Sequence, residues 1–269
     1  MENIVYTKIN VGLEKPVRIL HITDVHITES NDFDTDFHKK LMKERREVFV
    51  KEGNTPTKTP IEYYNEALAL AKKENMLFVC TGDVIDLHTN GNIAILQEIT
   101  GGVDRMFSPG GHEHQRDIVR TMEEPYPYVE NVRHKLEKEM SRFCLSLESR
   151  VVNGLNIVTA DNSLDYYSEK TLAALKKEIE KGLPIIVFSH DPIWDNLLNR
   201  WEPNHPNIRL TPKDYRISHG MIDILLNHPL VITTVAGHGH AFEEREINGK
   251  IHYMTDGLFK GAARIVEVF

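Results

Sequence analysis

Five short segments of the sequence carry side chains that bind metal ions or move protons, and each follows a run of apolar residues. In an extended chain, side chains two residues apart point to the same side, so a carboxylate and an imidazole spaced in this way can reach one ion. In chain order the segments are Asp24-Val25-His26, Gly82-Asp83-Val84-Ile85-Asp86, Gly110-Gly111-His112-Glu113-His114, Ser189-His190-Asp191-Pro192 and Gly237-His238-Gly239-His240.

Any one of these segments is weak evidence for a functional site. Asp-x-His occurs often by chance, and Gly-Asp is commonly just a turn. Five in succession, each after an apolar run, are not explained by capping aspartates and surface histidines. In a doubly wound sheet, the carboxyl ends of the strands lie along one edge, so all five segments can meet there.

The elements that would position these segments are short apolar runs alternating with helical patterns. This alternation predicts parallel strands with helices on both faces of the sheet. The last two strands, joined through Asp256-Gly257, would form an antiparallel edge or a second sheet. Strands are expected at 17–23, 76–81, 104–108, 155–160, 185–189, 231–236, 251–255 and 264–269. Helices are expected at 61–75, 88–100, 129–139, 168–180 and 214–227.

Two polar, irregular stretches interrupt this alternation, near 29–60 and 191–216. Both directly follow a strand-end segment, where α/β folds place functional loops, so we interpret them as substrate-recognition insertions within one domain spanning 1–269. The first contains a basic run interleaved with Glu44 and Glu47, which favours a solvated helix face over a nucleic-acid patch. The basic residues are Lys39, Lys40, Lys43, Arg45 and Arg46.

Composition limits the class of protein. With 41% hydrophobic and 27% charged residues, the chain has an ordinary globular composition. A net charge of −8 argues against a dedicated nucleic-acid binder. Cys80 and Cys144 are too few for a disulfide framework, which indicates reduced thiols and a cytoplasmic location. The sequence shows no signal peptide and no apolar run approaching the ~18 residues of a membrane span.

Histidines outside the five segments have blander interpretations. His21 lies within the first predicted strand, which favours a packed, hydrogen-bonded residue. His205 and His219 belong to or flank the second irregular stretch and could contact a substrate. Five others are interpreted as surface or capping residues. They are His38, His88, His134, His228 and His252.

The order of the five segments resembles that of the calcineurin-like metallophosphoesterases, and the resemblance covers nearly the whole chain. That family carries Asp-x-His, Gly-Asp-x-x-Asp, Gly-Asn-His-(Asp/Glu), a lone His after a strand, and Gly-His-x-His, in this order. The resemblance implies a two-sheet α/β sandwich with helices on its outer faces. It also implies a dinuclear metal centre at the carboxyl ends of the strands.

The resemblance also implies roles for individual residues. Asp83 would bridge two divalent ions, and mixed oxygen and imidazole sites of this kind suit Mn, Fe, Zn or Co. A metal-bound hydroxide would attack the phosphorus of a phosphate mono- or diester. His112 would be the general acid, with Asp86 as the carboxylate that orients it. The first ion would be held by Asp24, His26, Asp83 and His240, and the second by Asp83, His190 and His238.

One position departs from the family pattern. The family's second metal takes an amide ligand from the Asn between Gly and His, and this chain has Gly111 there. A weakened second metal site is the expectation. Water could fill the place of the amide, His114 or Glu113 could swing in, the site could bind weakly, or the chain could have degenerated.

Three functions remain open on this basis. The first is an enzyme that hydrolyses a small phosphate ester. The second is a degenerate family member that serves as a metal-binding or protein-binding scaffold with little activity, which Gly111 favours and the survival of the other site residues opposes. The third is a nuclease of the same superfamily, which the acidic net charge disfavours.

Overall fold

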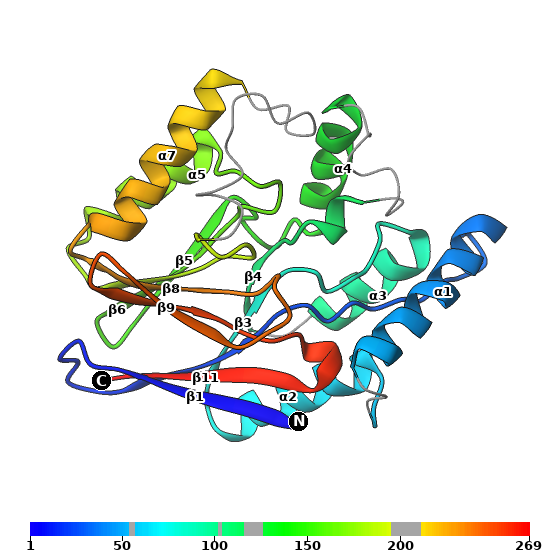
Figure 1. The fold of residues 1–269 in the computed structure, drawn as a ribbon, viewed down its shortest axis with the longest axis horizontal. Helices are drawn as coiled ribbons and strands as arrows, with labels where there is room; N and C mark the ends of the chain where they lie inside the picture. The colour runs from blue at the N-terminus through cyan, green and yellow to red at the C-terminus, as the bar shows by residue number, and fades with distance from the viewer. Residues whose placement is uncertain (54–56, 102–103, 116–125, 195–210) are drawn as a thin grey trace.

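The fold is a sandwich of two mixed β-sheets in a computed structural model that describes residues 1–53, 57–101, 104–115, 126–194 and 211–269 (Figure 1). The five-stranded sheet has the order β1-β11-β2-β3-β4, and the six-stranded sheet has the order β5-β6-β7-β8-β10-β9. The first sheet consists of β1 (Asn3–Ile9), β2 (Val17–Ile22), β3 (Leu77–Thr81), β4 (Met106–Ser108) and β11 (Ala262–Val268). The second consists of β5 (Leu147–Val152), β6 (Leu155–Ala160), β7 (Ile185–Phe188), β8 (Val231–Ala236), β9 (Glu243–Ile247) and β10 (Lys250–Met254).

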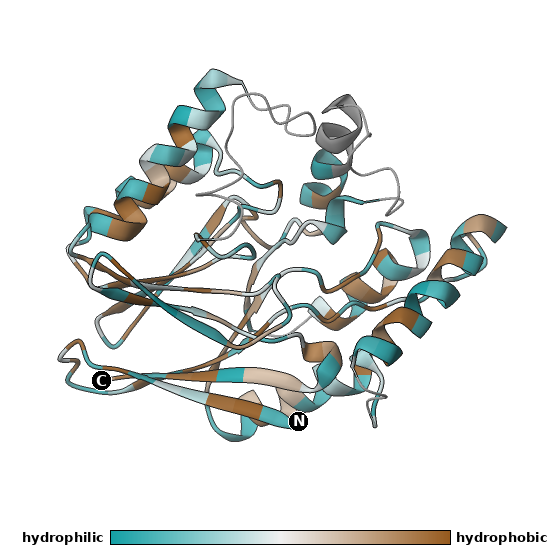
Figure 2. Ribbon diagram, in the orientation of Figure 1, coloured by the Kyte–Doolittle hydropathy of each residue, from teal (hydrophilic) through white to brown (hydrophobic). Residues whose placement is uncertain are grey.

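Helices cover the outer face of each sheet. Those on the side of the first sheet are α1 (Asp36–Glu52), α2 (Pro60–Lys73), α3 (Asn90–Thr100) and α4 (Tyr126–Glu139). Those on the side of the second sheet are α5 (Glu169–Ile179) and α7 (Pro212–Asn227). Two short 3₁₀ helices, η1 (His112–His114) and η2 (Leu258–Lys260), complete the described elements. Figure 2 shows apolar strands between helices that carry polar and apolar residues. None of the described helices is long and apolar enough to cross a membrane.

Alternating side chains along each central strand fill two different cores. In β2, Ile19 belongs to the core between the sheets, whereas its neighbour Leu20 belongs to the core beneath α2 and α3. In β7, Phe188 faces the core between the sheets and Val187 packs with α5 and α7. Because both faces of these strands are buried, their sequences are mainly apolar and do not alternate regularly with polar residues: β7 reads IIVF, and β2 reads VRILHI.

The two-sheet sandwich implied by the family resemblance is confirmed. The prediction of one sheet with helices on both faces is wrong, because the inner face of each sheet packs against the other sheet. The last two strands are not partners either. Strand β10 lies between β8 and β9, whereas β11 crosses to the first sheet and lies between β1 and β2.

Three strands were not predicted, and all are at sheet edges: β1, β5 and β9. Each has a mixed or polar sequence, and β9 reads EEREI with no fully buried residue. An edge strand needs backbone partners on one side alone and tolerates charged residues, so it leaves no apolar run in the sequence.

The first predicted insertion is largely helical. Helix α1 fills 36–52, and its N-cap Thr35 accepts a hydrogen bond from the His38 backbone amide. The solvated-face interpretation of its basic run fits the exposed Lys40 and Lys43 but is wrong for Arg45, which reaches a buried carboxylate. Of the second predicted insertion, 191–216, residues 195–210 lie outside the described chain.

Three of the histidines outside the five segments are buried. His21 is buried between Thr255 and Thr81, 2.8 Å from each hydroxyl, as expected for a packed, hydrogen-bonded residue. His88 and His252 are also buried, so the surface or capping interpretation is wrong for both. His88 Nδ1 lies 2.8 Å from the Glu113 carbonyl oxygen, and burial lowers the pKa of His252 to about 4.

Candidate metal centre

The segments that follow β2, β3 and β8 share an uncommon backbone conformation. Nine described non-glycine residues have positive φ, and five of them are predicted metal ligands. Such conformations cost ~1–3 kcal/mol each and cluster where the surrounding structure enforces them for function. The five are Asp24 (φ 51°), His26 (51°), Asp83 (49°), His238 (70°) and His240 (46°).

Backbone hydrogen bonds hold two of these strand ends together. Asp24 N donates to the Gly82 carbonyl at 3.0 Å, and His26 N donates to the Asp83 carbonyl at 2.9 Å. The loops after β2 and β3 therefore continue as a pair beyond the sheet. This pairing brings the carboxylates of Asp24 and Asp83 to one edge of the sandwich.

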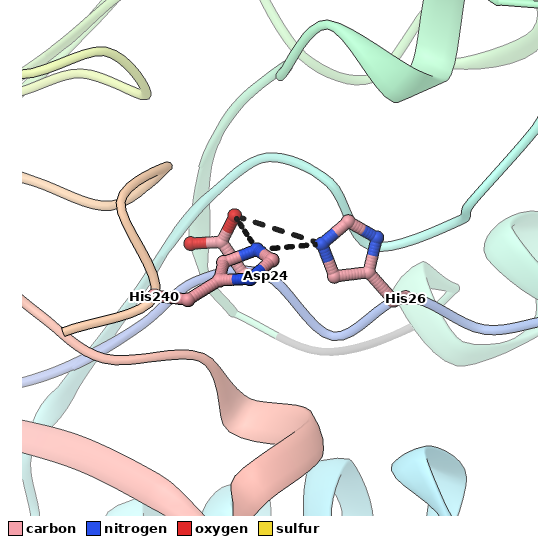
Figure 3. Close-up of side chains that lie close together, drawn as sticks. All are labelled: Asp24, His26 and His240. Atoms are coloured by element: carbon pink, nitrogen blue, oxygen red, sulfur yellow. Dashed lines mark hydrogen bonds and ion pairs between the residues drawn. The ribbon is translucent and has the colours of Figure 1, made fainter. Parts of the chain in front are cut away.

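A first cluster consists of Asp24, His26 and His240 (Figure 3). The Nε2 atoms of the two imidazoles lie 3.0 Å apart, and Asp24 Oδ1 lies 3.3 Å from His240 Nε2 and 3.8 Å from His26 Nε2. The other carboxylate oxygen of Asp24 accepts hydrogen bonds from the Thr23 hydroxyl and from His238 N. Asp24 Oδ1 is buried and accepts no hydrogen bond from the described residues, so it can bind a cation.

A second cluster consists of Asp83, His190 and His238. His190 Nε2 lies 3.2 Å from Asp83 Oδ2 and 3.4 Å from His238 Nδ1. Asp83 Oδ2 also lies 4.0 Å from His26 Nε2 in the first cluster. The Asp83 carboxylate therefore stands between the two clusters, where a bridging ligand would have to be.

The second ring nitrogen of three histidines faces an oxygen atom, and for His190 and His240 the contact is a hydrogen bond that fixes the orientation of the ring. His190 Nδ1 donates to the Thr81 carbonyl at 2.7 Å, and His240 Nδ1 lies 2.8 Å from Glu52 Oε1. His26 Nδ1 lies 3.3 Å from Asp86 Oδ1. Partners of this kind leave Nε2 available for a metal and make the imidazole a stronger ligand.

His112 lies next to both clusters and is fixed by Asp86. Its Nδ1 is 2.7 Å from the Asp86 carbonyl oxygen and 3.1 Å from Asp86 Oδ1, and its Nε2 is 3.9 Å from Asp83 Oδ2. Burial lowers the pKa of His112, but the carboxylates of Asp83 and Asp86 outweigh this effect and raise it to about 9. The ring therefore tends to keep its proton at neutral pH.

Buried negative charge dominates the electrostatics of this edge. Burial alone would raise the pKa of the Asp24, Asp83 and Asp86 carboxyls, yet neighbouring imidazoles hold all three below their ordinary values. Burial opposes a charged His240, and Asp24 and Glu52 raise its pKa to about 9. Closely spaced carboxylate and imidazole ligands around an unpartnered carboxylate oxygen fit divalent transition metals.

Glu113 and His114 are committed to other contacts. The buried carboxylate of Glu113 accepts hydrogen bonds from the backbone amides at Gly110, Asp83, Val84 and Ile85, at 2.6–3.2 Å. His114 Nε2 lies 3.0 Å from the Ser163 hydroxyl. Either side chain would lose these partners on moving to a metal.

The place of the missing amide ligand is sterically open. Gly111 has φ −64° and ψ −38°, a conformation that any residue adopts. A Cβ there would meet the Ser163 carbonyl at 3.5 Å and Gln115 Nε2 at 3.7 Å, which are ordinary contacts.

At the second cluster, Asp191 Oδ1 lies 3.4 Å from His238 Nδ1, and burial raises the pKa of this carboxyl to about 7.

The structure thus brings together Asp24, His26, Asp83, Asp86, His112, His190, His238 and His240. Sequence reasoning gave no role to Arg45, Glu52 or Asp191. The adjacency of Asp191 to His190 was visible in the sequence. The seven-residue spacing of Arg45 and Glu52 places them on one helix face, but nothing in the sequence shows that this face meets the site.

Fold and site together define a metal-binding α/β sandwich. A family model of calcineurin-like phosphoesterases matches residues 17–242, a range that includes all five segments. The chain belongs to this family, which binds dinuclear metal centres. Among curated protein sequences, none matches the chain.

Several solved structures are similar to the chain at low sequence identity. A dimetal phosphatase from Danio rerio is 14% identical with a TM-score of 0.50, covering 93% of this chain and 91% of that one. A putative 5′-nucleotidase from Staphylococcus aureus is 9% identical with a TM-score of 0.46, covering 90% of this chain and 49% of that one. GAP50, the anchor in the inner membrane complex of Plasmodium, is 11% identical with a TM-score of 0.46, covering 91% and 72%.

Replacing Glu113 by Ala should destabilise the loops that carry Asp83 and His112, because four buried amides would lose one charged acceptor. We expect the free energy of unfolding to fall by about 3–5 kcal/mol in urea titrations. Glu98→Ala, on the exposed surface of α3, is the control and should change it by no more than about 0.5 kcal/mol. If Glu113→Ala lowered the free energy of unfolding as little as Glu98→Ala does, the Glu113 carboxylate would not be what holds these loops.

Proposed function

We propose that the protein hydrolyses small phosphate esters, mono- or diesters, with two divalent ions such as Mn, Fe or Zn. The observation that carries the proposal is the Asp83 carboxylate, 3.2 Å from an imidazole of one cluster and 4.0 Å from an imidazole of the other. Two clusters sharing one carboxylate suit a pair of ions more than a single ion. The family match supports the same chemistry.

Each ion would have its own set of ligands. The first set is Asp24, His26, Asp83 and His240, and the second is Asp83, His190 and His238. Bound there, two divalent ions would polarise the phosphoryl oxygens and lower the pKa of a water molecule.

His112 is the candidate general acid. Its Nδ1 faces Asp86, so the proton to be transferred is on Nε2, the ring nitrogen nearer Asp83. Asp86 orients the ring and favours its charged form until the proton passes to the leaving oxygen. The return of a proton from water would restore the ring for another cycle.

A scaffold without activity is the second candidate, and Gly111 is the observation that favours it. The second cluster offers one carboxylate and two imidazoles, with no side chain from Gly111 itself. Against the scaffold stands the retention of His112 and Asp86, which a purely structural metal site would not need. We therefore favour the enzyme.

Turnover with Mn²⁺ tests this choice directly. An aryl phosphate, an aryl phosphodiester and a cyclic nucleotide should be assayed after dialysis against chelator and after Mn²⁺ is restored. We expect hydrolysis of at least one ester that chelation abolishes and Mn²⁺ restores. Two bound Mn²⁺ ions without turnover of any of the three would support the scaffold instead.

His112→Ala should keep the metals but lower turnover by roughly 10²–10⁴-fold, the usual range for loss of a general acid. The loss should shrink for nitrophenyl esters, because nitrophenolate leaves without a proton. His134 is an exposed histidine on α4 and provides the control. His134→Ala should leave turnover unchanged both for nitrophenyl esters and for esters with poorer leaving groups. An equal loss on good and poor leaving groups would remove His112 from the role of acid.

Gly111→Asn should raise the affinity for the second metal ion and raise activity at low metal concentration, because it restores a neutral oxygen ligand. The helical φ of Gly111 and the open space around its Cα allow the side chain without strain. Gly111→Ala is the matched control, since it adds the Cβ but no ligand. Equal Mn²⁺ affinity in all three forms would mean that another group already fills the place, and the candidate is Asp191, whose Oδ1 lies 3.4 Å from the imidazole of His238.

A further inference from the structure

One face of helix α1 lies against the metal centre. Arg45, Phe49 and Glu52 follow the i, i+4, i+7 spacing that puts side chains on one side of a helix. Each contacts a different part of the site. This helix belongs to the stretch between the first two strand-end segments, and Figure 1 shows it at the outside of the molecule.

Arg45 forms a two-pronged ion pair with Asp86. Its Nε lies 2.8 Å from Asp86 Oδ2, and its Nη2 lies 3.0 Å from Asp86 Oδ1. The same carboxylate faces Nδ1 of His26 at 3.3 Å and Nδ1 of His112 at 3.1 Å. A guanidinium that holds both oxygens fixes the plane of the carboxylate, and this plane sets the direction of both imidazoles.

Glu52 and Phe49 contact the two imidazole rings of the first cluster. Glu52 Oε1 lies 2.8 Å from His240 Nδ1, which leaves His240 Nε2 facing Asp24. The Phe49 ring stacks on the His26 ring, with the centroids 4.2 Å apart and the planes 19° apart. Both contacts hold an imidazole in one orientation without touching its Nε2.

We propose that α1 is a positioning element for the first metal ion and the general acid, with Arg45 acting through Asp86 and Glu52 acting through His240. The inference rests on the proposed function and names the residues that tune it. Neither Arg45 nor Glu52 touches the reacting atoms. Their role is to hold ligands that a metal would otherwise have to order on binding.

The contacts of α1 are confined to one half of the site. In the second cluster, His190 is held by the Thr81 carbonyl at the end of β3, and His238 lies 3.4 Å from Asp191. Neither partner belongs to α1. Loss of the α1 contacts should therefore lower the affinity for one metal ion and leave the affinity for the other unchanged. A general loosening of the fold would lower both affinities.

Polar contacts carry much of the docking of α1. Its buried residues are Met42 and Phe49, and a cavity of about 270 Å³ separates part of the helix from the start of α2. Arg46 adds a hydrogen bond to the Thr28 carbonyl at 2.7 Å. With so little apolar burial, the ion pair to Asp86 and the contact with His240 decide where the helix lies.

The test is a two-site Mn²⁺ titration of variants of the full chain, in which calorimetry measures the affinity of each site. Arg45→Met and Glu52→Ala should each lower the affinity for one ion by about 10–100-fold and leave the affinity for the other unchanged. Lys43→Met and Glu47→Ala are matched controls, since both residues are exposed on α1, and they should bind as the wild type does. Glu52→Gln, which keeps an oxygen acceptor for His240, should recover most of the loss.

A second readout separates positioning from stability. Arg45→Met should slow hydrolysis of alkyl esters more than that of nitrophenyl esters, because it misplaces the acid through Asp86. Thermal unfolding in chelator checks that each variant is folded. Wild-type affinity for both ions in Arg45→Met and Glu52→Ala, or equal weakening of both ions, overturns the proposal.

The outcomes also separate this proposal from the proposed function. A wild-type protein that binds two Mn²⁺ ions but hydrolyses no ester contradicts the function alone, and the titrations of the variants still decide the role of α1. Normal turnover with unchanged metal affinity in the variants contradicts the role of α1 alone. A wild-type protein that binds no Mn²⁺ contradicts both.

Discussion

Three carboxylates are buried together at one edge of the sandwich, and their negative charge governs how the surrounding loops and helices are arranged. Asp24, Asp83 and Asp86 are each at most 2% exposed. A buried carboxylate without compensation costs several kcal/mol, so this edge must gather positive charge. The imidazoles and the guanidinium of Arg45 supply part of it, and divalent cations would supply the rest. The left-handed backbone of five predicted ligand residues is the local strain that accompanies this convergence.

The same buried carboxylates explain two glycines close to the predicted ligands. A Cβ on Gly110 would lie 2.2 Å from Asp83 Oδ1, and a Cβ on Gly237 would lie 1.8 Å from the Thr23 hydroxyl oxygen. Backbone must approach these side chains closely for Asp83 and Asp24 to be held in place. A Cβ on Gly111 would meet no such obstacle, so no close approach requires glycine there.

The strand ends and their side chains could be predicted from the sequence because buried strands leave apolar runs and ligands follow directly after them. Asp24, Asp83 and His190 are of this kind. Edge strands such as β9 leave no such run, so three of them were missed. The contacts of Arg45 and Glu52 were beyond prediction for another reason. Their helix looks like any solvated, charged helix until the fold shows which surface it covers.

We propose that the buried charge at this edge belongs to a dinuclear metal centre bridged by Asp83. Anomalous diffraction from crystals grown with Mn²⁺ tests it most directly. We expect two peaks, one on each side of the Asp83 carboxylate: one beside Asp24 and His240 and the other beside His190 and His238. Well-ordered crystals in Mn²⁺ with no peak within bonding distance of Asp83 would contradict it.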